Sequence, residues 1–195
     1  MILFGCGGKK AATDDATDRA PRFGAKAGAN FSDITGPDVD SFKGKTSFHV
    51  GGVAEIPVSD DFAVQPELIY SEQGSDYEEE SFEGTVSVNY LNIPVMAKFQ
   101  VAEGLSVEAG PQIGFLLSAK DEYTYSGGSE EMDIKNDLKG TDFGINLGLG
   151  YELDNGLNFN ARYNLGLSNA NDGDFDGGAE YKNGVFQIGI GFFFN

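Results

Sequence analysis

The chain has 195 residues, a formal net charge of −18 and an isoelectric point near 4.2. This length suffices for one domain with a substantial packed interior. The negative charge argues against a nucleic-acid partner, because binding to phosphates needs clustered Lys and Arg. The single cysteine, Cys6, excludes a disulfide framework.

The first 21 residues differ from the rest of the chain. They read MILFGCGGKKAATDDATDRAP, and their apolar start is far shorter than the core of a signal peptide. We expect residues 1–21 to be a disordered lead-in or an expression remnant, with the native signal peptide absent from this chain. A second interpretation is that LFGC is the end of a lipoprotein signal, with Cys6 as the lipidated residue.

From residue 22 onward, apolar and polar residues alternate. Alternation indicates β-strands, because successive side chains point to opposite faces. The sequence Asp154-Asn155-Gly156 separates two such runs and predicts a tight hairpin turn. The pattern predicts eight strands, at residues 22–32, 46–56, 62–73, 89–100, 105–118, 143–153, 157–168 and 185–195.

The predicted connections alternate in length. Three are short turns, at residues 57–61, 101–104 and 154–156. Four are expected to be long polar loops, at residues 33–45, 73–87, 119–138 and 169–184. Short turns at one end and long loops at the other are typical of bacterial outer-membrane barrels.

The two faces of the predicted strands differ in composition. The apolar face carries aromatic residues near both strand ends and aliphatic residues between them, which is the pattern of a lipid-facing surface. The other face is polar and rich in glycine, as the narrow interior of an eight-stranded barrel requires. We therefore predict an all-β, eight-stranded, antiparallel up-and-down transmembrane barrel over residues 22–195. The structural alternative is a soluble ligand-binding barrel with its apolar face inward.

Several segments carry a resemblance to a known family. GAKAGANFSDI, VQPELIYSEQG, YLNIPVMAKF, GPQIGFLLSAK, FGINLGLGYEL and ARYNLGLSN resemble the outer-membrane β-barrel domain family of Bacteroidetes, often labelled porin-family or PorT-like. The resemblance covers residues 22–195 and implies an outer-membrane location and a removed signal peptide. It implies no single biochemical activity. Barrels of this kind tend to end in an aromatic residue, whereas here Phe194 is followed by Asn195.

Charged residues on the polar face are expected to lie inside the barrel. Because an isolated buried charge is too costly, these residues are expected to form a paired structural network. Its members are Lys26, Glu55, Glu67, Lys98, Glu108, Asp142, Glu152 and Arg162. The alternative interpretation is a narrow ion pathway that these groups line.

Two further patterns concern catalysis and metal binding. His49 is the only histidine, and with Ser47 and Ser71 it is a weak candidate for a hydrolase site. A structural, hydrogen-bonded His49 is the simpler interpretation, and no catalytic residue is assigned. The loop NDGDFDGGAEYKN matches the first half of a calcium-binding loop, and its possible Ca²⁺ ligands are Asp172, Asp174, Asp176 and Glu180. The plain alternative is an acidic surface loop.

These observations favour a monomeric barrel in the bacterial outer membrane with both chain ends in the periplasm. Its long acidic loops are then extracellular, facing lipid and lipopolysaccharide. The first functional hypothesis is a structural or surface-interaction protein. The second is a narrow, porin-like channel for ions or small solutes, and an outer-membrane hydrolase ranks lower. No nucleic acid is expected as a partner, and the partner of the loops stays open.

Overall fold

A computed structural model describes residues 20–35, 42–79, 82–125, 127–169 and 182–194. These residues form nine β-strands and one short 3₁₀ helix. The strands are β1 (Arg22–Thr35), β2 (Phe42–Pro57), β3 (Phe62–Glu79), β4 (Phe82–Ala102), β5 (Leu105–Tyr125), β6 (Gly128–Asp133), β7 (Thr141–Glu152), β8 (Leu157–Gly166) and β9 (Lys182–Phe194), and the helix is η2 (Lys135–Asp137).

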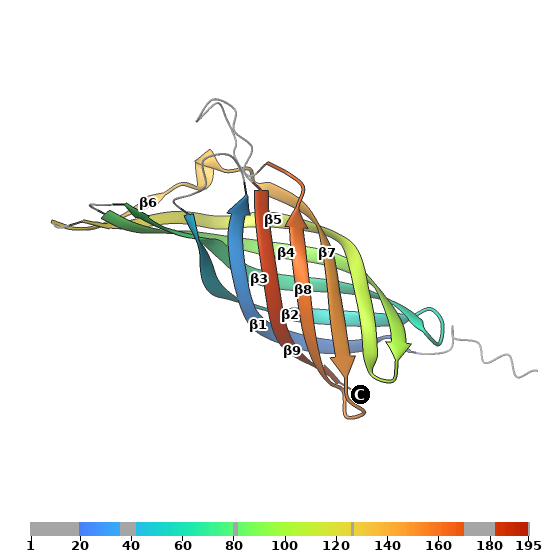
Figure 1. Cartoon of the computed structure of the whole chain (residues 1–195). Coiled ribbons are helices and arrows are strands. Elements are labelled where there is room, and N and C mark those ends of the chain that lie inside the picture. The colour runs from blue at the N-terminus through green and yellow to red at the C-terminus, as the bar shows by residue number, and fades with distance from the viewer. Residues whose placement is uncertain (1–19, 36–41, 80–81, 126, 170–181, 195) are drawn as a thin grey trace, which may run out of the picture.

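Eight of the described strands close into a ring (Figure 1). Each of them pairs antiparallel with its neighbours, and the ring closes where β1 pairs with β9. The strand β6 pairs with β5 alone and lies outside the ring. The predicted eight-stranded up-and-down barrel is therefore confirmed, and β6 is an addition to it.

The barrel has its apolar side outside and its polar side inside. Leu147 and Ile188 have exposed fractions of 61% and 50%, whereas Asn146 and Asn164 in the interior have 0% and 3%. An exposed apolar surface of this extent is not stable in water and needs lipid around it. The alternative of a soluble barrel with its apolar face inward is wrong, because polar side chains fill the interior. Among the described residues, no helix is long and apolar enough to cross a membrane.

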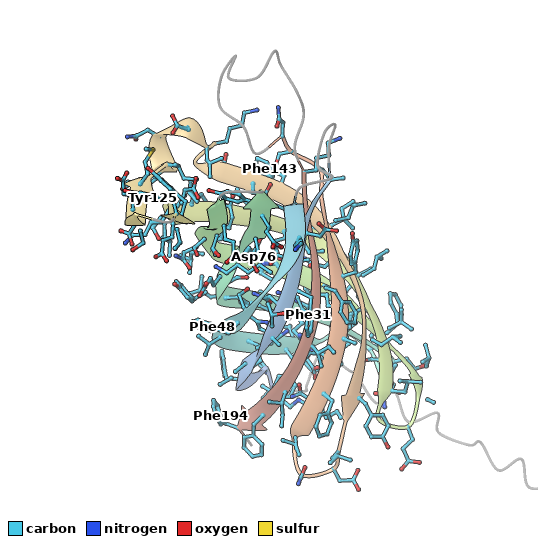
Figure 2. The ribbon with its side chains drawn as sticks, turned by 60° about the vertical axis from the view of Figure 1, so that its left-hand side comes forward. Phe31, Phe48, Asp76, Tyr125, Phe143 and Phe194 are labelled. Carbon is cyan, nitrogen blue, oxygen red and sulfur yellow. The ribbon has the colours of Figure 1, made fainter. Side chains whose placement is uncertain are left out.

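Aromatic side chains lie near both ends of this apolar surface. At the long-loop end, the rings of Phe31 and Phe186 are 6.2 Å apart and those of Phe48 and Tyr70 are 5.9 Å apart. At the short-turn end, the pairs are Phe62–Phe99 at 4.6 Å and Phe192–Phe194 at 6.0 Å. Figure 2 shows Phe143 and Phe194 towards opposite ends of the barrel. Two aromatic belts mark the depths of the two membrane interfaces.

The short turns lie where the sequence predicts them. Between β7 and β8, Gly156 has a φ of +85°, which a residue with a side chain adopts only with strain. The backbone N–H of Leu153 donates to the carbonyl of Leu157 over 2.8 Å and closes this turn. The chain therefore reverses within a few residues at this end.

Two of the predicted long loops are largely strand, which corrects the sequence interpretation. Residues 73–79 and 82–87 pair with each other as continuations of β3 and β4. Residues 120–125 pair with β6 at residues 128–133. We call the described parts of residues 72–89 and 118–139 the outer extension, because they continue outward past the ends of most other strands (Figure 1). Of those other strands, β2 still pairs with β3 as far as Tyr77. The interpretation failed because strands with water on both faces lose the apolar alternation by which we recognised the others.

Candidate functional site

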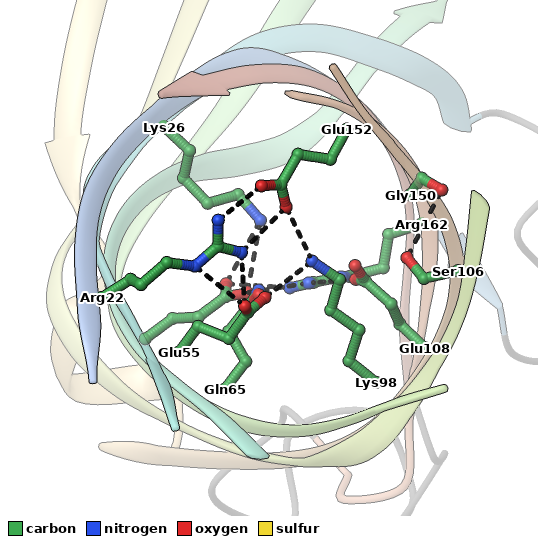
Figure 3. A network of polar contacts seen from close by, with 11 residues as sticks. Arg22, Lys26, Glu55, Gln65, Lys98, Ser106, Glu108, Gly150, Glu152 and Arg162 are labelled. Carbon is green, nitrogen blue, oxygen red and sulfur yellow. Dashed lines mark hydrogen bonds and ion pairs between the residues drawn. The ribbon is translucent and has the colours of Figure 1, made fainter. Parts of the chain in front are cut away.

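The eight charged residues expected inside the barrel all lie on its inner face. Six of them have exposed fractions of 7% or less: Lys26, Glu55, Glu67, Glu108, Asp142 and Arg162. Lys98 and Glu152 lie nearer the short-turn end and are partly exposed. Seven of these eight side chains form two ion-paired clusters (Figure 3), and Asp142 lies apart from them.

The inner cluster surrounds Arg162. Its guanidinium donates two hydrogen bonds to the Glu67 carboxylate, at 2.9 and 2.8 Å, and a third to Glu108 at 3.0 Å. The Lys26 ammonium lies 3.3 Å from Glu67, and the Gln65 amide donates to the same carboxylate over 2.8 Å. Two cations thus balance two carboxylates, so the buried charges cancel.

The outer cluster lies at the short-turn end and includes Arg22, which the sequence reading missed. Arg22 donates hydrogen bonds to Glu55 and Glu152, and Lys98 bonds to both carboxylates at 2.7 and 3.3 Å (Figure 3). The buried ring of Phe193 lies 4.5 Å from the Arg22 guanidinium carbon and 5.5 Å from the Lys98 nitrogen. The alternation of the strand could have predicted that Arg22 points inward, because it lies on the same strand face as Gly24 and Lys26.

Small residues make room for these clusters. A Cβ atom at Gly150 would lie 2.7 Å from a carboxylate oxygen of Glu108 and 2.8 Å from the Ser106 hydroxyl. The carboxylate therefore occupies the space that a side chain at position 150 would need. The glycine-rich inner face predicted from the sequence has this steric cause.

His49 is buried in the barrel and has no catalytic arrangement around it. Its Nδ1 lies 2.8 Å from the Asn30 side-chain oxygen, and no described atom pairs with Nε2. The Ser47 hydroxyl donates instead to the backbone carbonyl of Glu72 over 2.6 Å, and Ser71 accepts from Asn30 over 3.0 Å. The residues of the weak hydrolase hypothesis are thus engaged in other hydrogen bonds.

Asp142 lies on the inner face near the long-loop end. Its carboxylate accepts a hydrogen bond of 2.6 Å from the Ser168 hydroxyl. Close to this level, an apolar cluster lies on the inner face of β4 and β5. Its buried members are Val88, Tyr90, Leu116 and Ala119, with Val86, Ile134 and Leu138 packed against them. The segment after β6 therefore packs against β4 and β5 at the long-loop end.

The free space in the barrel is unevenly distributed. A vestibule of about 450 Å³ opens at the short-turn end, with the Arg22 cluster at its base and Asp60, Asp61, Glu103 and Asp154 among its lining residues. Further inside, between Lys26 and Lys98, the space is about 20 Å³. This volume holds about one water molecule. The ion pairs thus fill the barrel at that depth.

The outer extension carries most of its charge on exposed side chains. Its described residues hold eleven Asp or Glu and three Lys, a net charge of −8. Lys120 donates to Glu131 over 2.6 Å, and this bond raises the pKa of Lys120 and lowers that of Glu131. A hollow of about 430 Å³ lies on the extension, and its lining includes Asp76, Glu78, Glu83 and Glu122.

The predicted calcium ligands Asp172, Asp174, Asp176 and Glu180 lie outside the described residues, as does Cys6. Within the described part of the chain, no group of three or more His, Cys, Asp or Glu side chains has the geometry to hold a metal ion. The calcium site therefore stays a prediction.

Comparisons with known proteins identify the family. Residues 12–172 match the family model described as outer membrane protein beta-barrel domain, and no curated protein matches the chain. Two solved structures are similar: Ail, the attachment invasion locus protein of Yersinia pestis, at 17% identity and a TM-score of 0.56, and neisserial surface protein A at 11% identity and 0.53. Each alignment covers 90% of this chain and 100% of the other.

A second structure of Ail is a complex with the heparin analogue sucrose octasulfate, with the same identity and TM-score. At these identities the likeness shows the fold. The family match covers most of the chain and agrees with the apolar exterior and the two aromatic belts. The chain therefore belongs to the outer membrane protein beta-barrel domain family and is a small β-barrel of the bacterial outer membrane.

Proposed function

We propose that this barrel acts at the cell surface as an interaction protein, with a structural role in the membrane and no enzymatic activity. The observation that carries the proposal is the outer extension, a paired sheet that continues beyond the aromatic belt and whose described residues have a net charge of −8. A sheet held by backbone hydrogen bonds presents its side chains in a fixed arrangement, which lowers the entropic cost of binding.

The charge of the extension favours a basic partner. Ail has been crystallised with a polyanion, the heparin analogue. A polyanion would be repelled by the carboxylates of the present extension, whereas a polycation would be attracted. Lipopolysaccharide is also anionic, so the same carboxylates would repel it, and the nearby Lys43 and Lys45 are already ion-paired with Glu78 and Glu72. We propose that the barrel is monomeric and belongs with the Bacteroidetes barrels that it resembles.

The channel hypothesis is less well supported. A conducting pathway would have to pass the Arg162 cluster, where the free space is about 20 Å³. It would then have to pass the apolar cluster around Tyr90 and Leu116. We expect planar bilayers containing the protein to show no reproducible conductance steps, and regular steps would favour the channel over the interaction protein.

Binding of poly-L-arginine to the barrel in phosphatidylcholine nanodiscs tests the proposal. The test variant removes the four carboxylate charges that line the hollow on the outer extension, by Asp76→Asn, Glu78→Gln, Glu83→Gln and Glu122→Gln. A matched control makes the same change in charge at the short turns, by Asp60→Asn, Asp61→Asn, Glu103→Gln and Asp154→Asn. We expect the test variant to lose binding and the control to lose much less. Equal losses, or no binding by the wild type, would contradict the proposal.

We also propose that the loop around Asp174 binds Ca²⁺, on the spacing of its carboxylates alone. Calorimetric titration of the refolded barrel with CaCl₂ should show one site, and Asp174→Asn should abolish it. The matched control is Asp154→Asn, in a turn at the other end of the barrel. Heat of binding that survives Asp174→Asn unchanged would refute the site.

A further inference from the structure

The outer extension has two faces with different side chains. Residues that pair directly across strands share a face, so Val88 and Ala119 in the buried apolar cluster mark the inner one. Alternate residues of a strand share a face, so the residues that follow Ala119 in steps of two also lie on the inner face. They are Asp121, Tyr123 and Tyr125. Glu122, between Asp121 and Tyr123, points to the opposite face.

The inner face exposes apolar groups that lipid does not cover. Tyr125 has an exposed fraction of 42% and Met132 of 55%, although both lie beyond the aromatic belt. The pairing of Met132 with Asp121 and of Glu130 with Tyr123 places both β6 residues on this inner face. We call Asp121, Tyr123, Tyr125, Glu130 and Met132 the tyrosine face; Figure 2 shows Tyr125 near the tip of the extension.

Hydrogen bonds hold the aromatic rings of the tyrosine face in place. The Tyr123 hydroxyl donates to Glu130 over 2.6 Å, and the Tyr125 hydroxyl donates to the same carboxylate over 3.2 Å. The two ring centroids are 6.4 Å apart. On β3, Tyr77 donates to Asp121 over 2.8 Å. Each of these two carboxylates therefore lies beside tyrosine rings.

We propose that the tyrosine face binds arginine side chains of a partner polypeptide. The guanidinium group stacks on tyrosine rings and forms paired hydrogen bonds with a carboxylate, and this face offers both groups within one patch. Rigid tyrosines flanked by polar groups are also typical of the residues that dominate binding energy in protein interfaces. A basic partner fits this face because the described residues of the extension have a net charge of −8. This inference rests on the proposed surface-interaction function.

Two defined peptides test the inference on the barrel in phosphatidylcholine nanodiscs. Each peptide has eight residues: one is four repeats of Arg-Gly and the other is four repeats of Lys-Gly. Fluorescence anisotropy measures their dissociation constants. We expect the Arg-Gly peptide to bind more tightly, because lysine cannot form the planar paired bonds. Tyr125→Ala and Glu130→Gln should each raise the dissociation constant of the Arg-Gly peptide about tenfold, which is the usual effect of losing a desolvated cation–π or charged contact.

The matched control is Glu131→Gln, which removes the same charge from the same strand pair but from the opposite face, because Glu131 pairs with Glu122. We expect it to change the dissociation constant less than twofold. Each variant must first give the compact, faster-migrating band of a folded barrel on an unboiled gel, which separates loss of binding from loss of folding.

Three results would overturn the inference. If Glu131→Gln and Glu130→Gln weaken binding equally and Tyr125→Ala has no effect, net charge alone attracts the peptides. The proposal for the tyrosine face is then wrong, while the proposed function stands. If the wild type binds neither peptide nor poly-L-arginine, both fail together. If the wild type forms dimers that Tyr125→Ala separates, the occupant is a second copy of the chain.

Discussion

Replacing Arg162 with methionine should destabilise the barrel more than any other single change in its interior charges. Arg162 is 3% exposed and donates three hydrogen bonds, two to Glu67 and one to Glu108. The variant Arg162→Met keeps a long apolar side chain but leaves both carboxylates with Lys26 as the remaining nearby cation. Breaking a buried ion pair by removing one partner costs about 3–5 kcal/mol, because a charge stays buried without compensation.

Urea-induced unfolding in detergent micelles measures this loss. The unboiled gel band and tyrosine fluorescence report the folded fraction, since the chain has eight Tyr and no Trp. Arg22→Met serves as the control, because the Arg22 side chain is 32% exposed and water screens its ion pairs. The double variant Arg162→Met with Glu108→Gln restores the charge balance and should recover part of the stability.

The reasoning predicts an order of unfolding midpoints. Wild type should be highest, followed by Arg22→Met, then the double variant, with Arg162→Met lowest. If Arg162→Met unfolds at the wild-type urea concentration, the interior is hydrated enough to screen the charges and the argument from burial is wrong. If the double variant is less stable than Arg162→Met, charge balance is not the controlling quantity.

Three other predictions follow from single positions. Leu147→Arg, in the middle of the lipid-facing band, should cost about 2–4 kcal/mol in the same assay, and a smaller loss would argue against a lipid surface there. Gly51→Val should reduce the yield of folded barrel in refolding, because its Cβ would lie 2.1 Å from a backbone carbonyl, whereas Gly140→Ala, with open space, should not. The pKa of Tyr123 is raised because its hydroxyl donates to Glu130. This bond stabilises the extension below the usual tyrosine pKa and is lost as pH rises through the raised value. Glu130→Gln should therefore move part of the tyrosinate absorbance titration to lower pH, and an unchanged titration would contradict the contact.

The strands and their faces were accessible from the sequence because both follow from local periodicity. Alternation from Phe143 to Leu153 placed one strand and assigned each of its side chains to a face, and the structure agrees. The position of the aromatic residues then decided which face meets lipid. Neither step needs to know which residues meet across the barrel.

The contacts across the barrel depend on the tertiary structure. Arg22 meets Glu152 although 130 residues separate them, and Phe193 packs against Arg22 from the last strand. These contacts follow from strand register and barrel closure, which set the level at which each inward side chain lies. The sequence predicted which charged residues point inward. It did not predict that they form two separate clusters or that Asp142 belongs to neither.

The outer extension also shows what the sequence predicts and what only the tertiary structure decides. Its polar composition correctly indicated water-exposed segments, but composition alone does not distinguish a loop from a sheet with water on both faces. Backbone pairing of β3 with β4 and of β5 with β6 made it a sheet, and this pairing also placed Tyr123 and Tyr125 beside Glu130. Periodicity therefore determined the strands and their two faces, and the placement of aromatic and glycine residues determined which face meets lipid. Only closure and register decided which charges pair inside and which side chains meet outside, because both bring together residues that are distant in the chain.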